Sequence, residues 1–289
     1  MLNVSRTDDM KRYRVLTFDF DTRANVLGLM ISEGWEPHIQ EMWRQNQEAL
    51  RQQLIVQFGV HDATSKLQNF IALGAAPFSV VAFHNDFYRQ ARSAFITGSY
   101  YPSLTGVCAL GERVLNHLIL TLREDFRGTP EYQRVHRKDS FDNWDLAITT
   151  LENWGVLRTQ TVVLFRKLRD LRHRTLHFNP ATERGTREIA LDALRLFHEI
   201  VEEQFSAFGD RPWYIPNDTG ISFVRRTAES DAFVARVILP SCTRVGPCHT
   251  LQHSEDGNWA ALDPIDYPEC EVSDDKFIEL FKRAQNQVE

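Results

Sequence analysis

The sequence predicts a mainly α-helical protein with a central helical bundle, a helical N-terminal extension and a small α+β C-terminal appendage. Through most of the first 208 residues, apolar side chains recur every three or four positions, which is the period of a helix buried on one face. Glycine and proline interrupt this pattern where helices are expected to end. After residue 212 the sequence is rich in proline, glycine and β-forming residues. We therefore divide the chain into residues 1–78, 79–209 and 210–289.

The N-terminal extension is expected to hold one short strand followed by helices. Residues 14–20 are rich in β-branched and aromatic residues and favour a strand. Residues 35–58 and 63–73 show the helical period, and Gly59 separates them.

The central region is expected to form a bundle. Its predicted helices cover residues 80–97, 102–124, 144–154 and 159–178, with a polar loop at residues 127–142. Pro102 fits a first helical turn, where its missing N–H does no harm. The helix that follows residue 185 has the widest apolar face, made of Ile189, Ala193, Phe197, Ile200, Val201, Phe205 and Phe208. We expect this face to be core or a dimer interface.

The C-terminal region is expected to be a small α+β appendage. Residues 221–225 and 233–239 are strand candidates because of their β-branched and aromatic content. Ser273 is the expected N-cap of a final helix that runs to about Ala284.

The helix at residues 159–178 carries the most informative pattern in the chain. Its apolar stripe comprises Leu164, Leu168, Leu171, Thr175 and Phe178. The arginines and histidines of this helix therefore face away from the core. Pro180 disfavours helical geometry at the residue before it, so His177 is expected in the last turn.

These polar side chains have the chemistry needed to cleave RNA without a metal. Arg169, Arg172 and Arg174 can hold a phosphodiester through guanidinium forks, while the imidazoles of His173 and His177 can move protons near neutral pH. The 2′-hydroxyl of RNA is an internal nucleophile. Arg172 and His177 are five residues apart, about 140° around an ideal helix. Their convergence therefore needs a frayed last turn or a second copy of the motif.

The motif and its context resemble one known family. Arg172-His173-x-x-x-His177 resembles the R-x4-6-H signature of HEPN proteins, in which the residue after the arginine is commonly Asn, Asp or His. Ser99-Tyr100-Tyr101-Pro102 resembles the aromatic-rich start of the helix that packs against the motif helix in that family. The resemblance covers roughly residues 79–208, under half of the chain.

The resemblance implies a HEPN-like helical domain that dimerises, so that two motifs form one composite ribonuclease site. Such domains occur in toxins and in antiviral defence. The expectation is a metal-independent endoribonuclease without a cofactor. Arg172 would hold the phosphate, His177 would act as general acid or base, and His173 would be a second imidazole or a spacer. Arg169 and Arg174 would support substrate binding.

The expected partners are RNA, a second copy of the chain and an antitoxin or other defence-system protein. One alternative stays open. Some family members only bind or scaffold, so the domain can also be a catalytically inactive regulatory module that binds RNA or protein.

Positive charge is concentrated around the motif. The whole chain carries a net charge of -6, which argues against a protein that coats nucleic acid over its whole surface. Residues 158–187 hold eight Lys or Arg and two Asp or Glu, a local net of +6. A second basic group comprises Arg123, Arg127, Arg134, Arg137 and Lys138. We expect it to border the same groove, with ordinary surface charge as the competing interpretation.

Other classes of function find less support. No apolar run reaches the length of a membrane span and the amino end lacks a signal-peptide pattern, so we expect a cytoplasmic protein that does not enter a membrane. A zinc site is an alternative carried by Cys242, Cys248, His249, His253 and Cys270, although their spacing includes no C-x2-C knuckle.

Enzyme classes with well-known motifs are also poorly supported. Asp19 and Asp21 resemble the paired aspartates of haloacid-dehalogenase phosphatases, but the mostly helical continuation supplies no alternating strands. Glycine-rich phosphate loops and a G-x-S-x-G elbow do not occur. Cys108 lies on an apolar helix face and is expected to be a core thiol.

Overall fold

The computed structural model describes residues 10–176, 185–216, 220–253, 259–268 and 270–286. The chain forms two compact units. The helical unit is Asp19–Ser206, and the terminal unit combines Met1–Phe18 with Ala207–Glu289. The fold is mainly α-helical, as the sequence predicts. The boundaries of these units differ from those of the predicted domains. Residues 19–78 belong with the central bundle, and the first 18 residues belong with the C-terminal region.

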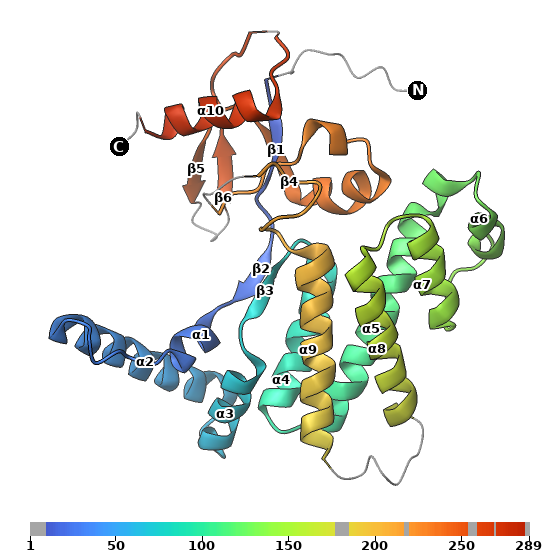
Figure 1. Ribbon diagram of the computed structural model, residues 1–289. Coiled ribbons are helices and arrows are strands. Elements are labelled where there is room, and N and C mark those ends of the chain that lie inside the picture. The colour runs from blue at the N-terminus through green and yellow to red at the C-terminus, as the bar shows by residue number, and fades with distance from the viewer. Residues whose placement is uncertain (1–9, 177–184, 217–219, 254–258, 269, 287–289) are drawn as a thin grey trace. The chain divides into compact units, whose positions relative to one another are not determined.

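The helical unit contains most of the regular structure (Figure 1). Its elements are β2 (Asp19–Asp21), α1 (Arg23–Gly28), α2 (Pro37–Phe58), α3 (Ala63–Leu73), β3 (Ala76–Ser79), α4 (Ala82–Ile96), α5 (Tyr100–Leu122), a 3-10 turn (Arg123–Phe126), α6 (Pro130–Val135), α7 (Trp144–Asn153), α8 (Thr159–Leu176) and α9 (Thr186–Phe205). Strands β2 and β3 pair antiparallel. The predicted helices at residues 35–58, 63–73, 80–97, 144–154 and 159–178 are confirmed to within two residues at their described ends.

Helix α5 is the centre of the bundle. It packs against α4, α7, α8 and α9 (Figure 1). Its buried side chains occupy one wide face, about half of the helix circumference, as expected for a helix that packs against several others on one side. They include Leu104, Val107, Leu110, Val114, Leu115, Leu118, Ile119 and Leu122. A side chain on α5 can therefore contact several helices at once.

The extension before the bundle is built on α2, which packs against α1 and α3. The buried Gln47 of α2 donates from Nε2 to the backbone oxygens of Val26 (3.0 Å) and Leu29 (2.8 Å). These bonds satisfy carbonyl groups near the end of α1 that have no partner within that helix. Helix α3 in turn packs against α4 and α9.

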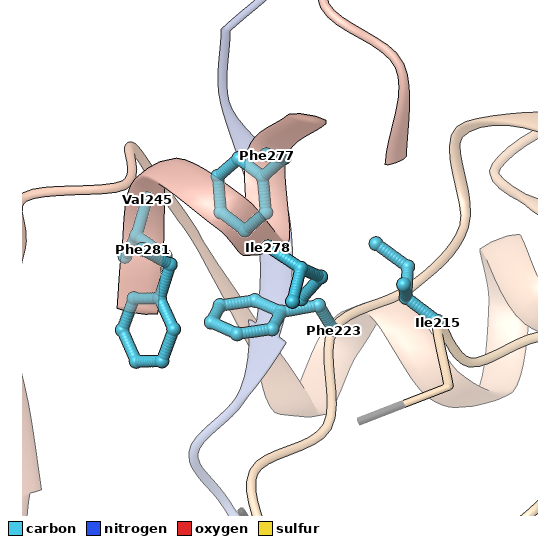
Figure 2. Close-up of a cluster of buried hydrophobic side chains, with 6 residues drawn as sticks. All are labelled: Ile215, Phe223, Val245, Phe277, Ile278 and Phe281. Atoms are coloured by element: carbon cyan, nitrogen blue, oxygen red, sulfur yellow. The ribbon is translucent and has the colours of Figure 1, made fainter. Parts of the chain in front are cut away.

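The terminal unit is built around a small aromatic core. Strand β1 (Arg12–Val15) pairs antiparallel with β4 (Cys242–Val245), and β5 (Thr250–His253) pairs with β6 (Trp259–Leu262). Figure 2 shows the core, in which Phe223 lies beside Phe277 and Phe281 of α10 (Asp274–Gln285). The ring of Phe223 meets those two rings edge-on, with centroids 5.0 and 5.1 Å away. Edge-to-face packing of this kind stabilises an aromatic cluster beyond its buried area.

Two features of the terminal unit test the sequence predictions directly. Ser273 is confirmed as the N-cap of α10, since its Oγ accepts from Lys276 N at 3.2 Å. The predicted strand at residues 233–239 is wrong, because Val234–Ile238 forms a π-helical turn and Leu239–Ser241 a 3-10 turn. A short apolar run fits a strand and a buried helical segment equally well.

The structure also differs from the sequence predictions for residues 14–20 and 127–142. The strand expected at residues 14–20 is divided between β1, which ends at Val15, and β2, which begins at Asp19. The polar loop expected at residues 127–142 contains α6, which is too short to show a helical period in the sequence. Thr129 caps that helix by accepting from Tyr132 N.

In the described part of the chain, no helix combines the length and the apolar content needed to cross a bilayer.

Gly111 of α5 lies in close contact with side chains of two other helices. A Cβ atom at this position would lie 2.7 Å from Cη2 of Trp144 and 2.9 Å from Cδ2 of Leu168. Trp144 is on α7 and Leu168 on α8, so a missing side chain at Gly111 lets both helices contact α5. Gly106, five residues earlier, is different: its Cβ would meet Ala91 at an ordinary 3.6 Å.

We predict that Gly111→Ala lowers the free energy of unfolding by about 1–3 kcal/mol, because it overpacks a rigid indole ring. The control Gly106→Ala should raise the same quantity by about 0.5–1 kcal/mol, since alanine favours a helix where space exists. Urea unfolding measures both. If both substitutions changed the free energy of unfolding equally, α5 would not lie as close to α7 and α8 as the structure shows.

Candidate functional site

Helix α8 presents the predicted motif on its solvent-facing side. Leu164, Leu168 and Leu171 are buried, as the predicted apolar stripe requires, and Thr175 of the same stripe is half-buried. The side chains of His173 and Arg174 are exposed, and Arg172 is intermediate. The predicted catalytic residue His177 lies outside the described residues, as do Phe178 and Pro180.

Arg172 is fixed by two side chains from other helices. Its Nη2 lies 3.2 Å from Oε2 of Glu112 on α5, and its guanidinium carbon is 5.8 Å from the ring centroid of Trp144 on α7. Nε1 of Trp144 donates to the same Glu112 oxygen at 3.1 Å. One carboxylate oxygen therefore receives both an indole N–H and a guanidinium, and the three groups form a closed triangle. We call Glu112, Trp144 and Arg172 the arginine clamp.

The same stretch of α5 also fixes the start of α7. Asn116 lies one turn after Glu112 on that helix. Its Oδ1 accepts from Phe141 N at 2.5 Å, and its Nδ2 donates to Phe141 O at 2.8 Å. This two-way bond anchors the segment that leads into Trp144. Two side chains of α5 therefore fix the position of the indole: Glu112 through its direct hydrogen bond, and Asn116 through the segment that precedes Trp144.

Cys108 lies beneath Arg172 in the core. It is fully buried, as the sequence predicts. Burial raises the pKa of its thiol to about 12, although the nearby charge of Arg172 acts in the opposite direction. The thiol therefore stays protonated at neutral pH, and it is not a nucleophile.

A groove of about 1090 Å³ runs along the motif face of α8. Its walls come from the start of α7, the C-terminal half of α8 and the middle of α9. The cations that line it are Lys167, Arg169, Arg172, Arg174 and Arg195, and His173 lies among them. The anions that line it are Asp142, Asp145, Asp170, Asp192 and Glu199. The positive charge expected from the sequence of α8 is thus balanced by carboxylates from all three helices.

The predicted substrate-binding residues are Arg169 and Arg174. They differ in their ion pairs and hydrogen bonds. Arg169 pairs with Asp170 (2.7 Å) and with Asp145. Its bond to Asp170, together with the charge of Asp145, raises the pKa of the guanidinium. Arg174 is exposed, and its Nε donates to the backbone oxygen of Asp170 at 3.4 Å. The structure therefore places Arg169, Arg172, His173 and Arg174 along the same groove, and Arg169 is held there in two ion pairs.

The second basic group predicted to border this groove does not line it. Arg123 donates to the backbone oxygens of Val135 (3.3 Å) and Lys138 (2.7 Å), so it fixes the loop around α6. Arg127 pairs with Glu124 at 2.6 Å. Both have a structural role within their own segment.

The residues of the site that were missed in the sequence include Glu112, Trp144 and Arg195. Glu112 had a usable signal, because it is the one acidic residue in the largely apolar stretch Tyr100–Leu122. Trp144 and Arg195 had none, since their approach to α8 depends on how the helices pack.

The zinc candidate and the aspartate pair considered from the sequence contain residues that make structural contacts. His249 is buried, with Nε2 2.5 Å from Nη1 of Arg14 and Nδ1 2.6 Å from Gly246 O. Within the described ranges, His, Cys, Asp and Glu side chains form no group of three or more that could hold a metal. Asp21 is paired with Arg23 at 2.8 Å.

Comparisons of the chain with protein-family models, with curated proteins and with solved structures found no match.

Proposed function

We propose that the protein is a metal-independent endoribonuclease of HEPN type that acts in a toxin or antiviral defence system. The observation that carries this proposal is the arginine clamp, which holds Arg172 at the wall of an open groove with His173 beside it. A preorganised guanidinium at a groove wall suits a phosphodiester, because it pays no ordering cost when the anion arrives.

The roles follow from the chemistry of each group. Arg172 holds the scissile phosphate and stabilises the charge of the pentacoordinate transition state. His177 takes the proton from the 2′-hydroxyl or gives one to the leaving oxygen, and His173 is the second imidazole or a spacer. Arg174 is exposed in the same groove and contacts the neighbouring phosphate. Arg169 supports the site through its ion pairs with α7 and α8.

A homodimer completes this site. Arg172 and His177 lie on different sides of one ideal helix, so a twofold pairing of α8 is the simplest way to gather two arginines and two histidines around one phosphate. An antitoxin or other defence-system protein is the expected regulator of such an activity.

A second candidate function is a catalytically inactive regulatory module that binds RNA or protein. The observation that favours it is the charge balance of the groove, where five carboxylates face five Lys and Arg side chains. Nucleic-acid surfaces usually carry an excess of positive charge. A mixed surface suits a protein partner with its own alternating charges.

The first test of function is RNA cleavage in excess EDTA. The wild-type chain should cut RNA but not the matching DNA, and should leave 2′,3′-cyclic phosphate and 5′-hydroxyl ends, because the 2′-hydroxyl is the nucleophile. Arg172→Ala and His177→Ala should each lower the rate about 10²–10⁴-fold. The double variant should be little worse than either single one.

Arg166→Ala is the matched control. Arg166 is on α8, pairs with Glu152 at 2.6 Å and does not line the groove. Its loss should leave the rate within about twofold of wild type, since surface ion pairs contribute little. Activity that vanishes in EDTA and returns with magnesium would overturn the mechanism. A wild-type chain that is inactive on many RNAs would favour the regulatory module.

The dimer is tested separately by light scattering. At micromolar concentration the purified chain should have twice the mass of the 289-residue protomer. A monomer that cleaves RNA with a rate proportional to protein concentration would contradict a composite site.

A further inference from the structure

A second cavity lies elsewhere in the helical unit, and its chemistry is different from that of the groove. It has a volume of about 440 Å³ and lies between β2, β3 and α4, with the ends of α2 and α3 closing it. None of its lining residues belongs to α7, α8 or α9. A concave site of this size fits a small organic molecule.

One part of the cavity wall is aromatic and aliphatic. Phe58 at the end of α2, Phe70 of α3 and Ile96 of α4 line it. The rings of Phe58 and Phe70 are 6.3 Å apart and tilted by 47°. Such a pair offers a face and an edge to a flat ring that enters between them.

Another part of the wall holds a buried cation. Arg92 of α4 is only 6% exposed, yet it lines the cavity. Its Nη2 donates to Gly74 O at 2.6 Å, and its guanidinium lies 5.7 Å from the ring centroid of the buried Tyr88. The bond to Gly74 fixes the guanidinium and uses one of its five N–H groups.

Of the charged residues that line the cavity, Arg92 is buried and Asp21 and Arg23 are half-buried, whereas Asp19 and Arg89 are exposed. Arg23 donates to both carboxylate oxygens of Asp21 (3.0 and 2.8 Å). Burial alone would raise the pKa of Asp21, but the bonds from Arg23 and the charges of Arg23 and Arg92 lower it. Asp21 therefore stays ionised. It is the one carboxylate in the less exposed part of the lining, where the guanidiniums of Arg23 and Arg92 also lie, and Asp19 is a second, exposed carboxylate of the lining. Arg89, also in the lining, pairs with Asp86 at 2.5 Å.

We propose that this cavity binds a small aromatic molecule that carries one negative charge. The ring of the molecule lies against Phe58 and Phe70, and its anionic group takes the remaining N–H donors of Arg92. A buried cation is costly unless it is paired, and a monoanion beside Arg92 balances the second guanidinium in the less exposed part of the lining. The proposal is independent of the ribonuclease activity, because the two sites share no residue.

The test uses two fluorescent probes and the full-length chain. 1-Anilinonaphthalene-8-sulfonate is an aromatic monoanion, and N-phenyl-1-naphthylamine is the same molecule without the sulfonate. The wild-type chain should bind the sulfonate at one saturable site, about tenfold more tightly than the neutral probe, because charge-assisted hydrogen bonds contribute on this scale.

Three variants then place the site. Arg92→Gln should weaken binding of the sulfonate about tenfold and leave the neutral probe within about twofold. Ser93→Phe, which puts a ring into the cavity that Ser93 lines, should block both probes. Arg51→Gln is the control, since Arg51 is on α2, pairs with Glu48 at 3.5 Å and lies outside the cavity. It should change neither affinity.

Far-UV circular dichroism and the melting temperature establish that each variant is folded. No saturable binding of the sulfonate by the wild type, or binding that survives Ser93→Phe in a folded chain, would overturn the proposal. Equal affinity of the wild type for the two probes would also overturn it, because the cation would then have no part in recognition.

Discussion

The site on α8 depends on one interaction between three helices, the arginine clamp of Glu112, Trp144 and Arg172. Glu112 Oε2 accepts from the indole and pairs with the guanidinium, while the ring of Trp144 lies against the same guanidinium. This arrangement requires that α5, α7 and α8 approach closely, which the bare backbone of Gly111 permits. Without that contact the guanidinium would have neither its carboxylate nor its ring, and α8 would present Arg172 as an ordinary mobile side chain.

The helical unit uses the same principle in two places. Arg172 in the groove and Arg92 in the cavity both lie against an aromatic ring and are held by an acceptor from another element. A cation that is already fixed in this way loses less side-chain conformational entropy when an anion binds to it. The two sites differ in shape and charge. The groove is open and has carboxylates along its walls, whereas the cavity is smaller and holds two guanidiniums and one carboxylate in its less exposed part.

The sequence predicted much of the fold and only part of the site. The periodicity of Leu164, Leu168 and Leu171 placed the motif of α8 on the outer face, because spacing along a helix determines which face is buried. It could not reveal that carboxylates such as Asp192 and Glu199 of α9 would face the same groove, since their approach depends on tertiary packing. The π-helical turn at Val234–Ile238 was missed because so short an apolar segment has no distinctive period.

The central claim is that Glu112 positions Arg172, and a double-mutant cycle tests it most directly. Glu112→Gln, Arg172→Gln and the double variant are unfolded in urea, and their free energies of unfolding are compared. Because the two side chains are about one-third exposed, we predict a coupling energy of about 0.5–1 kcal/mol. The control cycle pairs Glu112→Gln with Arg166→Gln and should be additive. Additivity within about 0.3 kcal/mol in the Glu112 and Arg172 cycle would contradict the account.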